Sequence, residues 1–291
     1  MTDITIIGLG HMGARIVELM LAAGHSVTVW NRSPRRADGF AGRAAIAADP
    51  AAALAASPIT LLLLADQVAA NDVLAAPGAA AVLAGRIVIN LGTIGPDDAV
   101  AAQAAIAAHG GRYLDGAIQA APSQMGRADT PILLAGAIAD FDAAEPLLRV
   151  LGGGLTHLGE AIDAAAYMDL ATLSYVYGAF AGFLHGARIA EARSIDVARF
   201  GRIVEAISPS FGAFFAHEAQ VIATGDFAIT ESPMRISLAA IRRIRDASIA
   251  LGLNAELPAL VDDWLGRAER AGLADSELAA VIAVLRQQGP A

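Results

Sequence analysis

The stretch ITIIGLGHMGARIVELMLAAG, residues 4–24, joins a β-branched apolar run to a run with helical spacing through a glycine-rich turn. Gly8, Gly10 and Gly13 fit the pattern G-x-G-x-x-G. In such a turn the first glycine permits a sharp bend, the second lets the backbone approach a pyrophosphate, and the third lets the helix pack on the strand. A purely structural glycine turn is the alternative. The position between strand and helix favours a dinucleotide site formed by Gly8, Leu9, Gly10, His11, Met12 and Gly13.

Short apolar runs alternate with longer alanine-rich runs through the first half of the chain. Strands that alternate with helices in this way form a parallel sheet that helices cover on both faces. The predicted strands are 4–8, 26–30, 59–65, 86–90, 112–116 and 131–136, and the predicted helices of this half include 12–24 and 96–110.

After about residue 156 the pattern changes, and no further strand is predicted. The expected helices are 161–192, 196–223, 234–251, 256–271 and 276–287. The fold class that follows is an α/β Rossmann domain, residues 1–160, followed by an all-α helical domain, residues 161–291. The first helix of the second domain, 161–192, is the longest of these helices.

The composition excludes several classes of function. The chain of 291 residues carries a net charge of −9, and we predict no nucleic acid partner because such a partner requires a basic face. It has no cysteine, so disulfides, thiolate metal sites and cysteine nucleophiles are excluded. All 20 basic residues are arginine, so no lysine can form a Schiff base or act as a general acid. No two of the six histidines have metal-ligand spacing, and no metal is predicted.

Residues 170–187 carry no formal charge, and this run approaches the length of a membrane span. The chain has no second such run and no basic flank, so we predict a helix buried on several sides and no membrane contact. The N-terminal residues include Asp3 and no basic region, which is not the pattern of a signal peptide, and a cytoplasmic protein is expected. A helix this long and apolar is hard to cover within one small domain. The length and apolar character of this helix therefore predict a homodimer with the helix at or near its interface.

The end of the predicted strand 26–30 indicates which dinucleotide is bound. An NAD site has an acid there for the ribose 2′-hydroxyl, whereas this chain has NRSPRR at 31–36 and no acid. Arg32 and Arg36 can pair with a 2′-phosphate, and Asn31 and Ser33 can add hydrogen bonds to it. A solvated basic turn is the alternative. The pattern favours NADP(H) over NAD(H) as the cofactor.

Two further strand ends carry candidate cofactor contacts, because ligands of open α/β sheets bind at the carboxyl ends of the strands. Leu64 and Ala65 end one predicted strand. Asn90 and Thr93 follow another, and they are candidate contacts to the nicotinamide ribose. For each of these two, a role as a strand-end turn residue is equally open.

Three segments together resemble the NADPH-dependent imine reductases and reductive aminases, which are related to the β-hydroxyacid dehydrogenases. They lie at 8–36, with GLGHMG and VWNRSPRR, at 113–126, YLDGAIQAAPSQMG, and at 169–186, DLATLSYVYGAFAGFLHG. The resemblance implies NADPH as cofactor. It implies a Rossmann domain joined by a long inter-domain helix to a helical domain for dimerisation and substrate binding. It also implies a domain-swapped homodimer, with the active site between the Rossmann domain of one subunit and the helices of its partner.

Counted back from GFLH at 182–185, Asp169 is where the resemblance implies a catalytic residue. The β-hydroxyacid dehydrogenases have a lysine there, and its ammonium stabilises the alkoxide formed from a ketone; this chain has no lysine. An imine accepts hydride as a protonated iminium. A carboxylate can hold that cation by attraction or donate the proton that generates it, and both roles stay open. The alternatives are a buried acid paired with an arginine such as Arg188, or an acid that faces solvent.

Tyr177 is the second candidate catalytic residue. It follows Asp169 by eight residues, which places both side chains on one side of a helix. It could hydrogen-bond the substrate nitrogen or orient the carboxylate. Phe211, His217 and Met234 are weaker candidates for the lining of a substrate pocket.

The leading hypothesis is an enzyme that reduces imines, cyclic imines in particular, or a ketone together with an amine, with NADPH as hydride donor. A β-hydroxyacid dehydrogenase-like carbonyl reductase is the first alternative. It is disfavoured because the chain has no lysine, and residues 113–119 contain no basic group to bind a substrate carboxylate. A non-catalytic NADP-binding protein is the second alternative.

Overall fold

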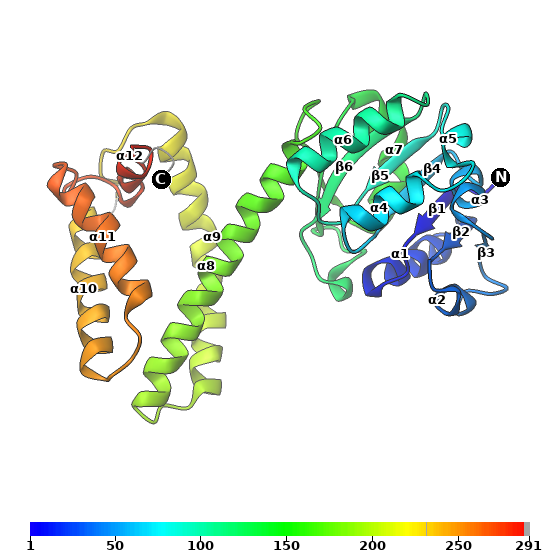
Figure 1. Cartoon of the computed structure of the whole chain (residues 1–291). Helices are drawn as coiled ribbons and strands as arrows, with labels where there is room; N and C mark the ends of the chain where they lie inside the picture. The colour runs from blue at the N-terminus through cyan, green and yellow to red at the C-terminus, as the bar shows by residue number, and fades with distance from the viewer. Residues whose placement is uncertain (231, 288–291) are drawn as a thin grey trace. The chain divides into compact units, whose positions relative to one another are not determined.

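The computed structural model describes residues 1–230 and 232–287, and within them the apolar runs of the first half form an eight-stranded sheet (Figure 1). Its order is β3-β2-β1-β4-β5-β6-β7-β8, which contains the Rossmann order 3-2-1-4-5-6. The order reverses at β1 and β4, and ligands of such sheets bind beyond the carboxyl ends of those strands. The strands are β1 (Ile4–Ile7), β2 (Val27–Trp30), β3 (Ala45–Ile46), β4 (Ile59–Leu62), β5 (Ile87–Asn90), β6 (Arg112–Ile118), β7 (Pro131–Ala135) and β8 (Gly154–His157).

The sheet is not wholly parallel, contrary to the prediction. β6 and β7 are antiparallel, with Asp115 opposite Ala135, whereas the other neighbouring strands are parallel. A parallel pair needs a long crossover, usually a helix. Between β6 and β7 the chain forms the short 3₁₀ turn η1 (Pro122–Gln124) instead, so it reverses direction. The strands β3 and β8, of two and four residues, were not predicted.

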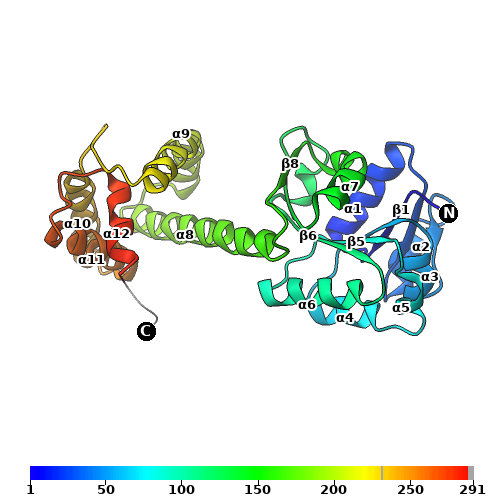
Figure 2. The ribbon, with the colours of Figure 1, turned by 90° about the horizontal axis from the view of Figure 1, so that it is seen from above.

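Alternating side chains of the strands fill two apolar cores, one on each face of the sheet. In β1, Ile4 and Ile6 enter one core and Ile7 enters the other, as the two-residue period of a strand requires. The prediction of a sheet covered on both faces is confirmed. The first core is covered by α1 (His11–Ala22) and α7 (Ile138–Leu151), and the second by α3 (Pro50–Ala55), α4 (Gln67–Leu74), α5 (Ala79–Val82) and α6 (Pro96–Ala107) (Figure 2).

The chain divides into two compact units, of which the first is Met1–Ser174. The second begins at Tyr175, inside the long helix α8 (Ala164–Ala192). Helices α10 (Met234–Ala250) and α11 (Glu256–Arg270) of the second unit pack around a small core that includes Met234, Leu238 and Leu265. The described residues after β8 contain no strand, which confirms the all-α second part. The helix between α8 and α10 is α9 (Val197–Thr224).

The predicted helix 276–287 is wrong as one continuous element. The chain there forms the 3₁₀ turn η2 (Leu278–Val281), followed by the single-turn helix α12 (Ile282–Leu285). The long helix α8, in contrast, begins within three residues of the predicted start and ends at the predicted residue.

The apolar side chains of α8 are exposed in the single chain, contrary to the expectation of a helix buried on several sides. Tyr175, Val176 and Phe180 are each exposed by half or more. The helix contacts α9 along one side, where the rings of Phe183 and Phe200 stack with centroids 5.4 Å apart. Among the described helices, none combines the length and the apolar character that crossing a membrane requires.

Candidate active site

The glycine-rich turn is held between β2 and β4 by backbone hydrogen bonds. Gly8 N donates to Trp30 O at 3.0 Å, and Leu63 N donates to Ile7 O at 2.8 Å. Gly8 has a φ of +101°, and a Cβ there would lie 2.2 Å from Leu63 O. A Cβ on Gly13 would lie 1.9 Å from Gly8 O. Both positions therefore require glycine, one for its conformation and one for the close packing of α1 on the turn.

Gly10 faces open space at the start of α1. A Cβ at Gly10 would meet the Arg36 guanidinium at 3.9 Å and nothing closer. Gly10 is the N-cap of α1, and no side chain caps this helix end. The first backbone N–H groups of α1 are thus available to a ligand, which is how a helix N-terminus binds phosphate groups.

A cavity of about 550 Å³ opens beside this turn. Every cofactor residue predicted from the sequence lines it, with the exception of Asn90 and Thr93. The predicted residues that it brings together are Gly8, Leu9, Gly10, His11, Met12, Gly13, Asn31, Arg32, Ser33, Arg36, Leu64 and Ala65.

The same cavity is also lined by five residues that were not predicted from the sequence, namely Trp30, Leu63, Ala69, Asp72 and Val73. Three of them, Ala69, Asp72 and Val73, have the spacing i, i+3, i+4 on α4, so they share one face of that helix. The sequence contained a signal for this helix, because Asp66 is a residue type that often caps a helix N-terminus. In the structure Asp66 caps α4 by accepting a hydrogen bond from Ala69 N. The helix itself was not among those predicted.

The basic turn after β2 lines the cavity through Arg32, Ser33 and Arg36. Arg36 Nη1 donates to Leu9 O at 3.4 Å. Asn31 is used differently from the expectation: its Oδ1 accepts from Leu9 N at 2.9 Å, and its Nδ2 donates to Ser33 O at 3.0 Å. The Asn31 amide therefore ties the glycine turn to the basic turn.

A second cavity, of about 260 Å³, places Asp169 beside the strand ends. Met12 and residues 63–65 line both cavities, so the two are adjacent within the first unit. The structure thus brings Asp169 and Thr93 together with residues of the predicted cofactor site. The full lining is Met12, Leu63, Leu64, Ala65, Leu91, Gly92, Thr93, Ala117, Ile118 and Asp169.

The Asp169 side chain is 7% exposed and is held by an amide. Gln119 Nε2 donates to Asp169 Oδ1 at 2.6 Å, and Thr172 Oγ1 donates to Gln119 Oε1 at 2.8 Å. No basic group in the described residues forms an ion pair with Asp169, and Arg188 pairs with Glu191 instead. A buried carboxylate without a cation is costly, and such groups are frequent at functional sites.

A second buried acid, Asp115, lies behind the strand ends. Asn90 Nδ2 donates to Asp115 Oδ1 at 2.9 Å and to Gly92 O at 2.9 Å, and Tyr113 Oη donates to Asp115 Oδ1 at 3.4 Å. Burial, with a smaller contribution from the charge of Asp169, raises the pKa of Asp115 to about 6 against the effect of these hydrogen bonds. Burial also raises the pKa of Tyr113, and the Asp115 charge adds to that shift.

The contacts of Asn90 differ from the expected contact to the nicotinamide ribose. Its side chain is 3% exposed and lines neither of the two cavities. Instead it holds the turn that carries Thr93, by bonding Gly92 through both its amide nitrogen and its amide oxygen. This is the role of strand-end turn residue that the sequence also allowed.

The remaining candidates lie in the second unit. Tyr177 is 68% exposed on α8, and Phe211 is 45% exposed on α9 beside Phe215. The assignment of Met234 to a pocket is wrong, because its side chain is fully buried in the core between α10 and α11. Met234 and Leu238 stand one helical turn apart, so both enter that core.

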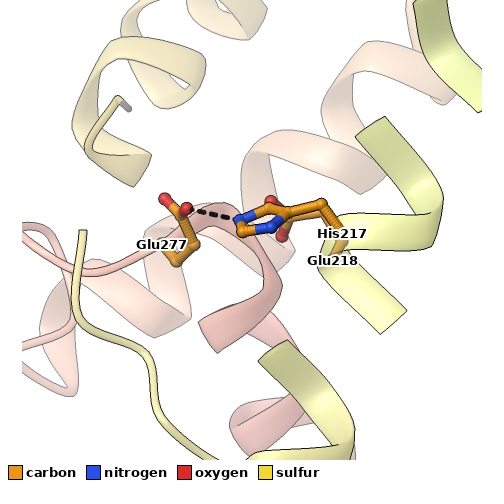
Figure 3. Close-up of side chains that lie close together, drawn as sticks. All are labelled: His217, Glu218 and Glu277. Atoms are coloured by element: carbon orange, nitrogen blue, oxygen red, sulfur yellow. Dashed lines mark hydrogen bonds and ion pairs between the residues drawn. The ribbon is translucent and has the colours of Figure 1, made fainter. Parts of the chain in front are cut away.

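His217 belongs to a polar cluster with Glu218 and Glu277 (Figure 3). Their ligand-type atoms lie within 4.8 Å of one another, so the cluster has the chemistry of metal ligands. Its carboxylates are already used: Ala279 N donates to Glu218 Oε2 at 2.6 Å, and Thr230 Oγ1 donates to Glu277 Oε1 at 2.6 Å. The first bond fastens η2 to α9, and the second fastens the loop after α9 to the residue before η2, so both carboxylates have structural partners within the second unit.

Comparisons with known proteins agree on both units. Residues 3–159 match the model of the NAD binding domain of 6-phosphogluconate dehydrogenase. Residues 162–287 match the model of the C-terminal domain of the NADPH-dependent reductive aminase-like proteins. An NADPH-dependent reductive aminase of Aspergillus oryzae is 26% identical over 96% of this chain and 95% of its own length.

Two solved structures extend this similarity. A reductive aminase from Aspergillus terreus, solved in complex with NADPH4, cyclohexanone and allyl amine, is 31% identical with a TM-score of 0.87. The match covers 98% of this chain and 99% of that one. An imine reductase from Pseudomonas sp. is 26% identical with a TM-score of 0.88, over 98% and 99% of the two chains.

Proposed function

Because this chain belongs to the family of the NADPH-dependent imine reductases and reductive aminases, we propose that it reduces imines, cyclic imines in particular, to amines with hydride from NADPH. One observation carries the proposal. The Asp169 carboxylate borders a cavity that shares Met12 and residues 63–65 with the cavity of the glycine-rich turn.

The residues of the first cavity fit NADPH. Gly10 and the uncapped start of α1 suit the pyrophosphate, and Arg32 and Arg36 suit the 2′-phosphate. Asp72 is the acid that lines this cavity, and it comes from α4 and not from the end of β2. When bound, NADPH supplies the hydride that forms the new C–H bond, while the π electron pair of the iminium becomes the lone pair of the amine nitrogen.

Asp169 serves this reaction as the partner of the substrate cation. An imine is a good hydride acceptor once it is protonated, and its charge is then present before the hydride arrives. The buried carboxylate has an amide as its side-chain partner and no cation among the described residues, so an iminium would supply the missing positive charge. Tyr177 stays a prediction as a second catalytic residue, two helical turns further along α8.

The absence of lysine separates this proposal from carbonyl reduction. A ketone that accepts hydride becomes an alkoxide, and a carboxylate in the same place would repel that anion. Asp169 has the wrong sign for a β-hydroxyacid dehydrogenase-like reductase and the right sign for an iminium. A ketone together with an amine is a second substrate class, because the two condense to an imine, and the Aspergillus terreus relative was solved with such a pair.

We also propose that two copies form a homodimer through the apolar sides of α8 and α9. In the single chain Phe180 and Leu184 of α8 are about half exposed, as are Ile203 and Ile207 of α9. Within each helix the two residues are one turn apart, and exposed apolar side chains at this spacing are typical of a helix face that packs against a partner. In the proposed dimer the active site is shared between subunits, as the family resemblance implies. A cytoplasmic location stays a prediction.

One experiment distinguishes the candidate functions. NADPH consumption is followed by absorbance with a five-membered cyclic imine and with a ketone plus an amine, and NADP⁺ reduction is followed with a 3-hydroxy acid. Turnover of the imine supports the proposal. Turnover of the hydroxy acid alone would assign the chain to carbonyl chemistry, and NADPH binding without turnover of any substrate would indicate a non-catalytic binding protein.

A further inference from the structure

Gln119 connects Asp169 to Thr172 by two side-chain hydrogen bonds. Gln119 Nε2 donates to Asp169 Oδ1 at 2.6 Å, and Thr172 Oγ1 donates to Gln119 Oε1 at 2.8 Å. The backbone of Gln119 is also fixed, because its N–H donates to Pro131 O at 3.1 Å at the end of the β6–β7 pair. The amide is therefore held at both ends, on the side of Asp169 that faces the sheet.

The direction of these bonds depends on the charge of Asp169. An ionised carboxylate accepts hydrogen bonds and cannot donate them, so it requires the NH₂ end of the Gln119 amide. A protonated Asp169 would donate its proton and would favour the oxygen end instead. In the structure the NH₂ end faces Asp169, and the hydroxyl of Thr172 lies 2.8 Å from the oxygen end of the amide and 2.9 Å from the backbone oxygen of Asp169, both of which can accept its proton. A bond from an N–H group to a charged oxygen is the stronger kind, which favours the ionised form.

Asp115 of β6 is near enough to Asp169 that the charge of Asp169 raises the pKa of Asp115. The other residues that line the cavity of Asp169, from α1 and the ends of β4, β5 and β6, are neutral. The side chain that hydrogen-bonds the Asp169 carboxylate is the Gln119 amide.

We propose that Gln119 is a positioning residue that keeps Asp169 ionised, so that Asp169 binds the iminium as its counter-ion and does not supply its proton. The substrate then enters already protonated, and the amine released after hydride transfer takes its next proton from water. This inference rests on the proposed imine reduction, and it decides between the two roles that the sequence left open for Asp169.

The test is the pH dependence of kcat/KM for a five-membered cyclic imine in the wild type, Gln119→Leu, Thr172→Val and Thr172→Ser. Activity that needs ionised Asp169 is lost as the pH falls through its pKa. Gln119→Leu removes the donor and raises that pKa, so the acid limb should move up by about one pH unit. Thr172→Val should move it in the same direction by less, and Thr172→Ser, which keeps the hydroxyl, should leave it in place. The substrate titrates identically in every variant, so the differences between profiles belong to the protein.

Two outcomes of the pH profiles would overturn the inference. If Asp169 were the proton donor, Gln119→Leu would instead move the basic limb to higher pH, because the acid would stay protonated longer. If Gln119 were merely structural, its loss would lower kcat/KM by the same factor at every pH.

The failure of the proposed function is distinguishable from both results. It would appear as wild-type protein that turns over no imine, or as Asp169→Asn with full turnover. Infrared titration of ¹³C-aspartate-labelled protein, with Asp169→Asn subtracted, measures the protonation of Asp169 without any turnover. Gln119→Leu should shift that titration upward as well, and an unchanged titration would contradict the inference.

Discussion

Arg36 of α2 (Pro34–Asp38) reaches across to the glycine-rich turn and donates through Nη1 to the backbone oxygen of Leu9, 3.4 Å away. A Cβ on Gly10 would lie 3.9 Å from its guanidinium, so Arg36 lies beside the turn that is proposed to bind the pyrophosphate. Arg35, its neighbour on the same short helix, does not line the cavity. The two arginines form a matched pair for testing cofactor choice.

Arg36→Ala should raise KM for NADPH by about tenfold or more and leave KM for NADH nearly unchanged, because a charge-assisted bond to the 2′-phosphate is lost. Arg35→Ala is the control and should change neither value. The measurement is initial rates with both cofactors. Equal increases for NADPH and NADH in Arg36→Ala would show that the arginine supports the turn and does not read the phosphate.

Asp169→Asn should lower kcat for imine reduction by about a hundredfold or more, because the amide cannot balance the charge of the iminium. The affinity for NADPH, measured by fluorescence titration, should stay within about twofold of the wild type. Asp163→Asn, a change just before α8 and outside both cavities, is the control. Retained turnover in Asp169→Asn would end the assignment of a catalytic role to this residue.

Gly13→Ala should destabilise the fold by about 1–3 kcal/mol and weaken NADPH binding, because the new Cβ would lie 1.9 Å from Gly8 O. The readout is the thermal unfolding midpoint with and without NADPH. Gly201→Ala is the matched control, since it lies inside α9 with nothing within 4 Å of the new Cβ, and it should be neutral or stabilising. Equal midpoints for Gly13→Ala and the wild type would show that the turn has another conformation.

Asp115→Asn should change how stability depends on pH. The folded-state pKa of Asp115, about 6, lies above its ordinary value, so the folded protein binds this proton more tightly than the unfolded chain does. The binding of this proton stabilises the folded protein fully below about pH 4, and this stabilisation is lost as the pH rises to about 6. The variant should therefore gain about 3 kcal/mol relative to the wild type over that interval. Urea unfolding of both proteins between pH 4 and 7 measures the difference, and a constant difference would contradict the raised pKa.

Phe180→Glu should convert the proposed dimer into a monomer, because it places a charge in the middle of the apolar side of α8. Light scattering after size exclusion gives the mass directly. Val100→Glu, which changes a similarly exposed apolar side chain on α6, is the control and should leave the mass unchanged. A wild-type mass equal to that of one chain at all concentrations would contradict the dimer.

The cofactor side of the site was predictable because its residues are neighbours in the sequence. Residues 8–13 form one turn and residues 31–36 the next, and both follow strands whose pairing places their ends together. The Asp169 side was less predictable. Its place beside the Rossmann core required the family resemblance, and its partner Gln119, 50 residues earlier, carries no motif. The same limit applies to Asn90, whose residue type suits a ligand contact as well as the turn that it holds.

The sequence by itself determined the α/β order, the glycine positions, the sign of the charge at residue 169 and the absence of any lysine to replace it. These follow from local spacing and residue type, which act over a few residues. Only the tertiary structure decided that β6 and β7 run antiparallel, that Met234 is buried in a core and that Asp169 is bound by an amide and not by an arginine. Each of these depends on contacts between residues that are far apart in the sequence. Hydrophobic periodicity indicates the local structure of a segment and does not indicate such contacts.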